Sequence, residues 1–316
     1  MKRRLRVALM ALVALSGAAR GAASQTQLVI VTGLGGEPKY SQAFSELSHA
    51  LAEAAHTRAG LADSAIVWLG EKNDVQSRWY RGTSRRENIE AALGRLATRP
   101  DSGEQVVLVL VGHGSGEGAD TRISLPGADL TAADFAKLLS RFGRRRVAFI
   151  NLTSASGDML PVLSAPSRVV VTATKSAFER NESQFGRFFV DAFARDGADA
   201  DKDGRVSFLE AFRYAESETR RFYEDQGRLA TEHAQMSDAG ELARRFYLTA
   251  ATSATGVSDA RLAALYAERG ALDEQIQALK KRKATMSATS YEQELERLLL
   301  MLARKARDIR QLERGA

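Results

Sequence analysis

Three mainly apolar runs constrain the fold of this chain more than any other feature. They span residues 106–111, 147–152 and 169–174. The first run is unbroken, which is typical of a strand that is buried on both faces of a parallel sheet. Shorter runs at residues 28–32 and 65–69 have the same character. The sequence therefore predicts a mainly parallel sheet whose strands are spread along much of the chain.

Helical patterns separate these apolar runs. Thr131 is expected to cap one helix, and the sequence Ser84-x-x-Glu87 predicts a capping box that opens another. Strands that alternate with helices predict an α/β fold in which right-handed crossovers place helices on both faces of the sheet. The predicted helices cover residues 41–55, 84–97, 131–139, 182–195 and 208–223.

The pattern changes near residue 258. Two sets of apolar residues repeat every seven positions on either side of a polar break at residues 284–290. Each set predicts an amphipathic helix, and the pair predicts a coiled-coil-like antiparallel hairpin over residues 258–316, separate from an α/β domain at 24–250. The basic run at 280–283 is interpreted as a solvated helix terminus. The hairpin is a candidate surface for a protein partner. The repeats are Leu265, Leu272 and Leu279, then Leu295, Leu302 and Ile309.

Residues 1–23 have the composition of a signal peptide. A basic start precedes the apolar run Val7–Leu15, and small residues precede Ser24. This order is typical of export signals, and the run is too short to cross a bilayer, although a membrane anchor is the alternative. We expect a periplasmic or secreted protein without a membrane span in the mature chain.

Composition excludes several kinds of chemistry. Removing residues 1–23 takes away five basic residues and lowers the formal net charge from +6 to +1. The basic isoelectric point is therefore no evidence for nucleic-acid binding, and none is expected. The chain has no cysteine. Disulfides, a cysteine nucleophile and a thiolate metal site are all excluded.

Polar residues follow two of the predicted strands. His113 comes directly after the run at 106–111, and Ser154 follows the run at 147–152. Ligands of open parallel sheets bind beyond the carboxyl ends of the strands, so these side chains are candidates for one crevice. A purely structural histidine is the alternative. The Gly-x-Ser-x-Gly elbow of α/β-hydrolases is absent here, and Pro38 interrupts the dinucleotide fingerprint that Gly33 and Gly35 would begin.

These strand ends resemble the legumain and caspase group of cysteine peptidases. One strand ends in His113-Gly114, and another leads to Ser154 and then Gly157. The resemblance covers about residues 27–238 and is strongest to exported bacterial legumain-like proteins. It implies that His113 matches the catalytic histidine, that Ser154 replaces the catalytic cysteine, and that the backbone N–H groups of Gly114 and Ser154 match the oxyanion donors. Further similar segments are Thr172-Ala173-Thr174, Asn181-Glu182-Ser183 and residues 231–235.

The serine changes what this resemblance implies for function. A serine hydroxyl is a weak nucleophile unless a base, itself oriented by a third group, activates it. The sequence identifies no carboxylate for that third role. We therefore expect a pseudoenzyme, a binding or scaffold relative that takes a peptide or protein ligand in the crevice. The alternatives are an active serine-type peptidase that uses His113 and Ser154, and a structural module whose functional part is the hairpin.

A separate motif predicts a calcium site. The segment DADKDGRVSFLE, residues 199–210, has an oxygen donor at each ligand position of an EF-hand loop and Gly204 at its sixth position. Helical patterns flank the segment on both sides. The alternative is an acidic capped turn without metal. The predicted ligands are Asp199, Asp201, Asp203, the Arg205 carbonyl, Ser207 and Glu210.

Overall fold

The structure is a computed structural model. It describes the chain except for residues 1–25, 74–75, 102–103, 203, 239–241, 249–259 and 316. The predicted signal peptide at 1–23 therefore lies outside the described residues.

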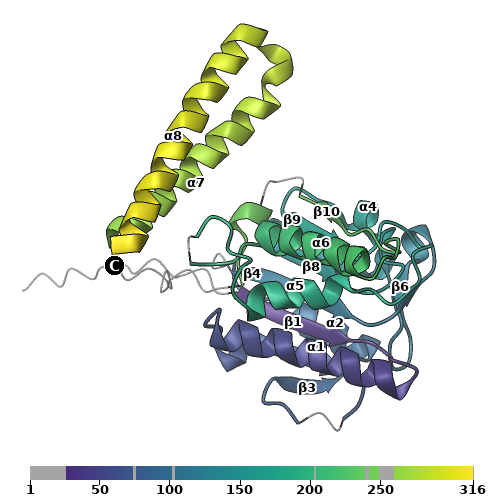
Figure 1. Cartoon of the computed structure of the whole chain (residues 1–316). Coiled ribbons are helices and arrows are strands. Elements are labelled where there is room, and N and C mark those ends of the chain that lie inside the picture. The colour runs from purple at the N-terminus through teal and green to yellow at the C-terminus, as the bar shows by residue number, and fades with distance from the viewer. Residues whose placement is uncertain are drawn as a thin grey trace, which may run out of the picture.

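A seven-stranded sheet forms the centre of the molecule, in the order β10-β9-β8-β4-β1-β2-β3. All neighbouring strands in it are parallel except β10, which pairs antiparallel with β9. The predicted α/β fold with a mainly parallel sheet is confirmed (Figure 1). The strands are β1 Thr26–Thr32, β2 Ile66–Gly70, β3 Tyr80–Thr83, β4 Gln105–Val111, β8 Val147–Asn151, β9 Arg168–Thr172 and β10 Gln235–Ser237.

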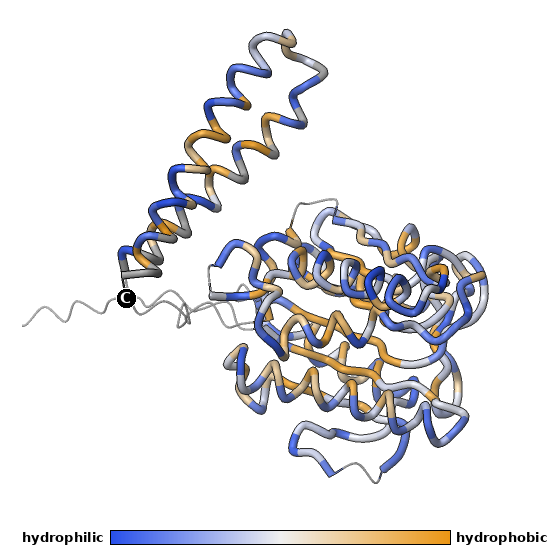
Figure 2. Tube along the Cα trace, in the orientation of Figure 1, coloured by the Kyte–Doolittle hydropathy of each residue, from blue (hydrophilic) through white to orange (hydrophobic). Residues whose placement is uncertain are grey.

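Helices cover both faces of this sheet. One face packs against α1 (Pro38–Thr57), α5 (Phe185–Ala194) and α6 (Phe208–Asp225). The other packs against α2 (Arg86–Ala97), α3 (Ala132–Ser140) and α4 (Met159–Leu163). Alternate residues of each central strand enter the two cores. The central strands are largely apolar, as their orange colour in Figure 2 shows. Burial on both faces explains why the polar residues of these strands lie only at or next to their ends.

Several short elements carry no signal in the sequence. A second, antiparallel sheet consists of β5 (Gly114–Ser115), β6 (Arg122–Ile123) and β7 (Leu130–Thr131).

The predicted capping box at Ser84 is wrong. The N-cap of α2 is Arg85, and the hydroxyl of Ser84 instead donates to the carbonyl of Thr32 at 2.6 Å. By contrast, Thr131 does cap α3, in a capping box with Asp134.

The C-terminal part folds as two helices, α7 (Ala260–Lys281) and α8 (Ala288–Gly315), which pack against each other. Four apolar residues of the repeats are buried between them: Leu272, Ile276, Leu279 and Leu298. Other apolar side chains of α8 remain exposed, namely Leu299, Leu300 and Met301. In the part of the chain that the structure describes, no helix combines the length and apolarity needed to cross a membrane.

The start of α3 provides a test of how the two helices on that face are held together. Asp134 accepts hydrogen bonds from the N–H and hydroxyl of Thr131 and pairs with Arg86 of α2 at 2.8 Å. The hydrogen bond from the Arg86 guanidinium is the main cause that lowers the pKa of Asp134 to about 2. Because its ordinary pKa is about 3.9, the stability that Asp134 contributes is fully present above about pH 4 and is lost as the pH falls toward 2.

We therefore predict that Asp134→Asn lowers the free energy of unfolding at neutral pH and that this difference from the wild type shrinks between pH 4 and pH 2. Urea unfolding at a series of pH values measures it. Glu87→Gln, which removes an exposed carboxylate in the first turn of α2, is the control. A difference in the free energy of unfolding that stays constant with pH would show that Arg86 does not lower the pKa of Asp134.

Candidate functional site

The pairing of β4 with β8 brings the two predicted site residues together. Leu110 lies opposite Asn151 in this parallel pair, so the segments that follow the two strands leave the sheet side by side. His113 and Ser154 line the same small cavity at the carboxyl edge of the sheet, together with residues of α1 and of the start of α5. The structure thus places both residues at one site, as the sequence predicts, and leaves their role untested.

The turn after β8 is held by a set of short hydrogen bonds. Asn151 is buried, and its side-chain oxygen accepts from the N–H of Thr153 at 3.0 Å and from its hydroxyl at 2.7 Å. The N–H groups of Ser156 and Gly157 both donate to the hydroxyl of Thr174 beyond β9, at 2.7 and 3.1 Å. The small polar residues of this turn therefore fix it to the neighbouring strand end.

Backbone conformation adds strain next to the candidate nucleophile. Ala155 has a φ of 49°, in the left-handed region that residues other than glycine seldom adopt. Its N–H donates to the carbonyl of Glu179 at 2.8 Å, which holds the turn in this conformation. The result is that Ser154 occupies a sharply defined position, only 4% exposed.

His113 is held by aromatic packing. Its ring meets the rings of Tyr40 and Phe44 edge-on, with centroids 4.9 Å away in each case. Its carbonyl accepts from the N–H of Ser124 at 3.0 Å. Among the described residues, no carboxylate hydrogen-bonds to the ring of His113. The orienting partner that a catalytic histidine needs is therefore not in contact here.

The contact between the two strand ends runs through Gly114. Its N–H points to the hydroxyl oxygen of Ser154 at 3.4 Å, which is a long hydrogen bond. The resemblance assigns this N–H to an oxyanion hole, whereas here it faces the hydroxyl itself. The cavity between His113 and Ser154 has a volume of only ≈ 30 Å³. The cavity is therefore small, and Ser154 beside it is almost fully buried.

Glu182 also lines this cavity, and the sequence did not single it out as a candidate acid. It lies between the end of β9 and the start of α5, on the same edge of the sheet as His113. Its side chain is exposed and makes no hydrogen bond to the ring of His113 among the described residues. The sequence signals for it were its place at the start of a predicted helix and in the segment Asn181-Glu182-Ser183 that resembles the legumain group.

The entry to α5 has its own buried carboxylate. Glu232 is 5% exposed and accepts from the N–H groups of Gln184 and Phe185, at 2.7 and 3.0 Å, and from the hydroxyl of Ser183 at 2.5 Å. The hydroxyl of Tyr223 donates to it as well, at 3.0 Å. Burial is the main cause that raises the pKa of Tyr223. Glu232 therefore serves to fix the start of α5, and with it one wall of the crevice.

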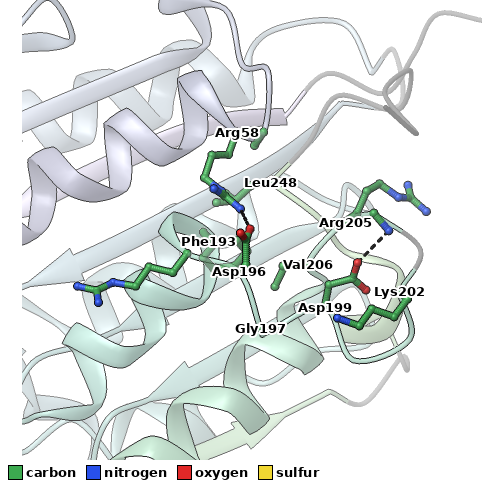
Figure 3. A pocket seen from close by; sticks show the side chains of 12 residues that line it. Arg58, Phe193, Asp196, Gly197, Asp199, Lys202, Arg205, Val206 and Leu248 are labelled. Atoms are coloured by element: carbon green, nitrogen blue, oxygen red, sulfur yellow. Dashed lines mark hydrogen bonds and ion pairs between the residues drawn. The ribbon is translucent and has the colours of Figure 1, made fainter. Parts of the chain in front are cut away.

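The predicted calcium loop lies at the opposite edge of the sheet. It follows α5 and borders a cavity of ≈ 450 Å³ that Arg58 and Ala59, just beyond α1, also line. Figure 3 shows Arg58 and Asp196 paired on one side of this cavity and Asp199 and Lys202 on the other. A loop and a crevice on opposite edges can influence each other only through the elements between them.

Within the loop, three of the predicted ligands converge. Carboxylate oxygens of Asp199, Asp201 and Glu210 lie within 4.8 Å of one another. Asp199 accepts from the N–H of Gly204 at 2.9 Å, and Gly204 has a φ of 85°, which a turn of this kind requires. Asp203 lies outside the described residues. The oxygen donors and the glycine fit calcium, which prefers carboxylate and carbonyl ligands.

Ser207 and Glu210 have a further role in this structure. They form the capping box of α6, with the hydroxyl of Ser207 2.8 Å from Glu210 and the Glu210 N–H 3.2 Å from that hydroxyl. The loop is also tied down, because the N–H of Phe208 donates to the carbonyl of Phe246 at 2.9 Å. The guanidinium of Arg205 lies over the ring of Tyr247 at 3.9 Å. Two of the predicted calcium ligands, Ser207 and Glu210, thus also begin α6.

Comparison with known proteins gives structural matches only. No family model matches the chain, and no curated protein matches it. The structure is similar to that of caspase-1 from Spodoptera frugiperda, with 11% sequence identity, 74% of this chain and 94% of that one covered, and a TM-score of 0.45. It is also similar to a structural-genomics protein from Geobacter sulfurreducens, with 13% identity, 67% and 92% coverage, and a TM-score of 0.44.

The close contact at Gly114 generates a prediction. A Cβ at this position would lie 2.3 Å from the carbonyl oxygen of Ser154 and 2.8 Å from the hydroxyl of Thr153. We expect Gly114→Ala to lower the free energy of unfolding by about 1–3 kcal/mol, since one strand end must move away from the other. Thermal melting measures this. Gly94→Ala is the control, because a Cβ there meets nothing within 4 Å and should stabilise α2. Equal melting temperatures for Gly114→Ala and the wild type would show that the strand ends are not closely packed.

Proposed function

We propose that this chain is an exported, non-catalytic relative of the caspase and legumain peptidases that acts as a binding or scaffold protein. The observation that carries the proposal is the burial of Ser154, which is only 4% exposed beside the small cavity that it lines with His113. The aromatic packing of His113 without a carboxylate partner supports the same conclusion.

The binding surfaces follow from this proposal. A peptide or protein ligand would approach the carboxyl edge of the sheet, where α1 and the start of α5 border the crevice. A protein partner would approach α8, on which Leu299, Leu300 and Met301 are exposed. The narrow crevice also favours the alternative in which the α/β domain is a structural module and the hairpin binds the partner. A periplasmic or secreted location rests on the composition of residues 1–23 alone.

One observation favours the rival function, a serine-type peptidase. His113, Ser154 and Glu182 line one cavity, so a nucleophile, a base and an acid lie at the same site. If a ligand displaced the aromatic residues around His113, the carboxylate of Glu182 could orient the ring, as the third group of a triad does. This function requires a rearrangement of the crevice before chemistry.

We predict no hydrolysis of peptide bonds at neutral pH. The measurement is turnover of a fluorogenic peptide library by the chain from residue 24 onward. Ser154→Ala and His113→Ala should match the wild type, and so should Ser140→Ala, which changes an exposed serine of α3. Turnover that Ser154→Ala and His113→Ala abolish, that Glu182→Gln lowers and that Ser140→Ala leaves intact would establish the peptidase instead.

The second part of the proposal is a calcium site at residues 199–210. The convergence of Asp199, Asp201 and Glu210 supports it. Like charges held this close repel one another, and a divalent cation would relieve that repulsion. Bound calcium would also join the end of α5 to the start of α6, since the loop connects these two helices.

We predict that calcium in hundredfold excess over its dissociation constant stabilises the native state by about 2.7 kcal/mol and raises the melting temperature by several degrees. Magnesium should have a smaller effect, because it prefers a smaller octahedral shell. Glu210→Gln and Asp199→Ala should remove most of the shift. Glu216→Gln, an exposed carboxylate on the same helix, should leave it unchanged. No heat of binding in calorimetry of metal-stripped protein would contradict the site.

A further inference from the structure

A second cavity lies at the carboxyl edge of the sheet, beyond β1 and β2 and beside the first turns of α1. Its volume is ≈ 250 Å³, much larger than that of the cavity at His113. Ligands of parallel sheets bind at this edge. Neither the resemblance nor the site described above involves this cavity. The residues that matter for the argument are Ser41, Gln42 and Ser45 of α1, Trp68 of β2, and Glu71 and Lys72 after β2.

Glu71 is the unusual member of this lining. Its Oε2 atom is buried and has no hydrogen-bond partner among the described residues. Buried polar atoms are nearly always hydrogen-bonded, and an unpaired carboxylate oxygen is more costly than a neutral one. Glu71 also lines the cavity, so a small rotation of its carboxylate would let a ligand or an ion there supply the missing donor.

The neighbouring groups do not satisfy Glu71. Trp68 donates its indole N–H to the hydroxyl of Thr32 at 2.8 Å, and that hydroxyl lies 2.7 Å from the hydroxyl of Ser48. Lys72 lines the same cavity but forms no ion pair with Glu71 in the described part of the chain, and its side chain is exposed. The loop itself is held by Tyr80, whose hydroxyl donates to the carbonyl of Lys72 at 2.7 Å.

The other walls are suited to an organic ligand. The hydroxyls of Ser41 and Ser45 can accept hydrogen bonds. The amide nitrogen of Gln42 donates to Glu46 at 2.8 Å, which leaves its carbonyl oxygen as an acceptor. Trp68 adds an apolar wall. One carboxylate with neutral acceptors and an aromatic wall suits an organic cation better than a metal ion, which needs several charged ligands.

We propose that this cavity binds a small organic cation, a protonated amine or a guanidinium group, which donates to the Glu71 carboxylate. The ligand could be a free amine or the side chain of a lysine or arginine in a peptide, because the recognised chemistry is the same. This inference goes beyond the proposed function and does not depend on it, because the cavity is lined by none of the residues of the His113 site.

The test is calorimetric titration of the chain from residue 24 onward. Agmatine represents the free cation, and an acetylated, amidated tripeptide with a central arginine represents the peptide. The corresponding citrulline tripeptide is a neutral isostere. We expect at least one cationic probe to bind and the citrulline peptide to bind roughly tenfold more weakly or not at all, since a hydrogen bond to a charged group is lost. Binding of agmatine alone would identify the free amine as the source, and binding of the arginine peptide alone the peptide side chain.

Variants separate this site from general charge effects. Glu71→Gln keeps the shape of the side chain and should weaken binding roughly tenfold or more. Glu53→Gln, an exposed carboxylate further along α1, should not change it. Ser45→Leu should block the cavity with the carboxylate intact, which keeps the test decisive if Glu71→Gln fails to fold. Absence of binding by both cationic probes, or equal binding by the Glu71→Gln variant and the wild type, would overturn the proposal.

Discussion

The parallel pairing of β4 with β8 decides which side chains can meet at the carboxyl edge of the sheet. Five residue pairs, from Val106↔Val147 to Leu110↔Asn151, set the register of these strands. A shift of one residue would turn every side chain of a strand into the core on the other face, so close packing on the two faces specifies the register. His113 and Ser154 meet because of this register, whatever their chemical role. The tight contact at Gly114 is a consequence of the same pairing.

The central strands could be predicted from the sequence because burial on both faces leaves a continuous apolar run, as at β4, β8 and β9. The short strands of the second sheet and β10 could not, since two or three residues show no periodicity. Ser84 satisfied a local capping rule, but its hydroxyl bonds to the carbonyl of Thr32, which only the folded chain brings near. Local patterns fail where a distant backbone group competes for the same side chain.

The candidate site was also predictable only in part from the sequence. The strand ends themselves place His113 and Ser154, so the sequence was sufficient for them. Glu71 gave no signal, and Glu182 gave none for a role as an acid, because their significance depends on cavities that residues from several elements enclose. The spacing of oxygen donors drew attention to the acidic loop, and three of its carboxylates do converge, while the structure adds that Glu210 also caps α6. The fixed position of α5 connects the two ends of the molecule. Gly186, in its first turn, lines the crevice, and Phe193, in its last, borders the cavity beside the acidic loop.

The order of strands in the sheet has a consequence for how the chain is made. β2 joins one side of β1 and β3 joins β2, whereas β4, β8 and β9 are then added one after another on the other side. Each new strand in this series can therefore pair with an edge that already exists when it leaves the ribosome. The corresponding weakness is that a chain interrupted after β4 (Gln105–Val111) would present a strand that is apolar from Val106 onward, with one edge unpaired. Such an edge pairs readily with other chains, so incomplete synthesis of this protein would produce aggregation-prone fragments.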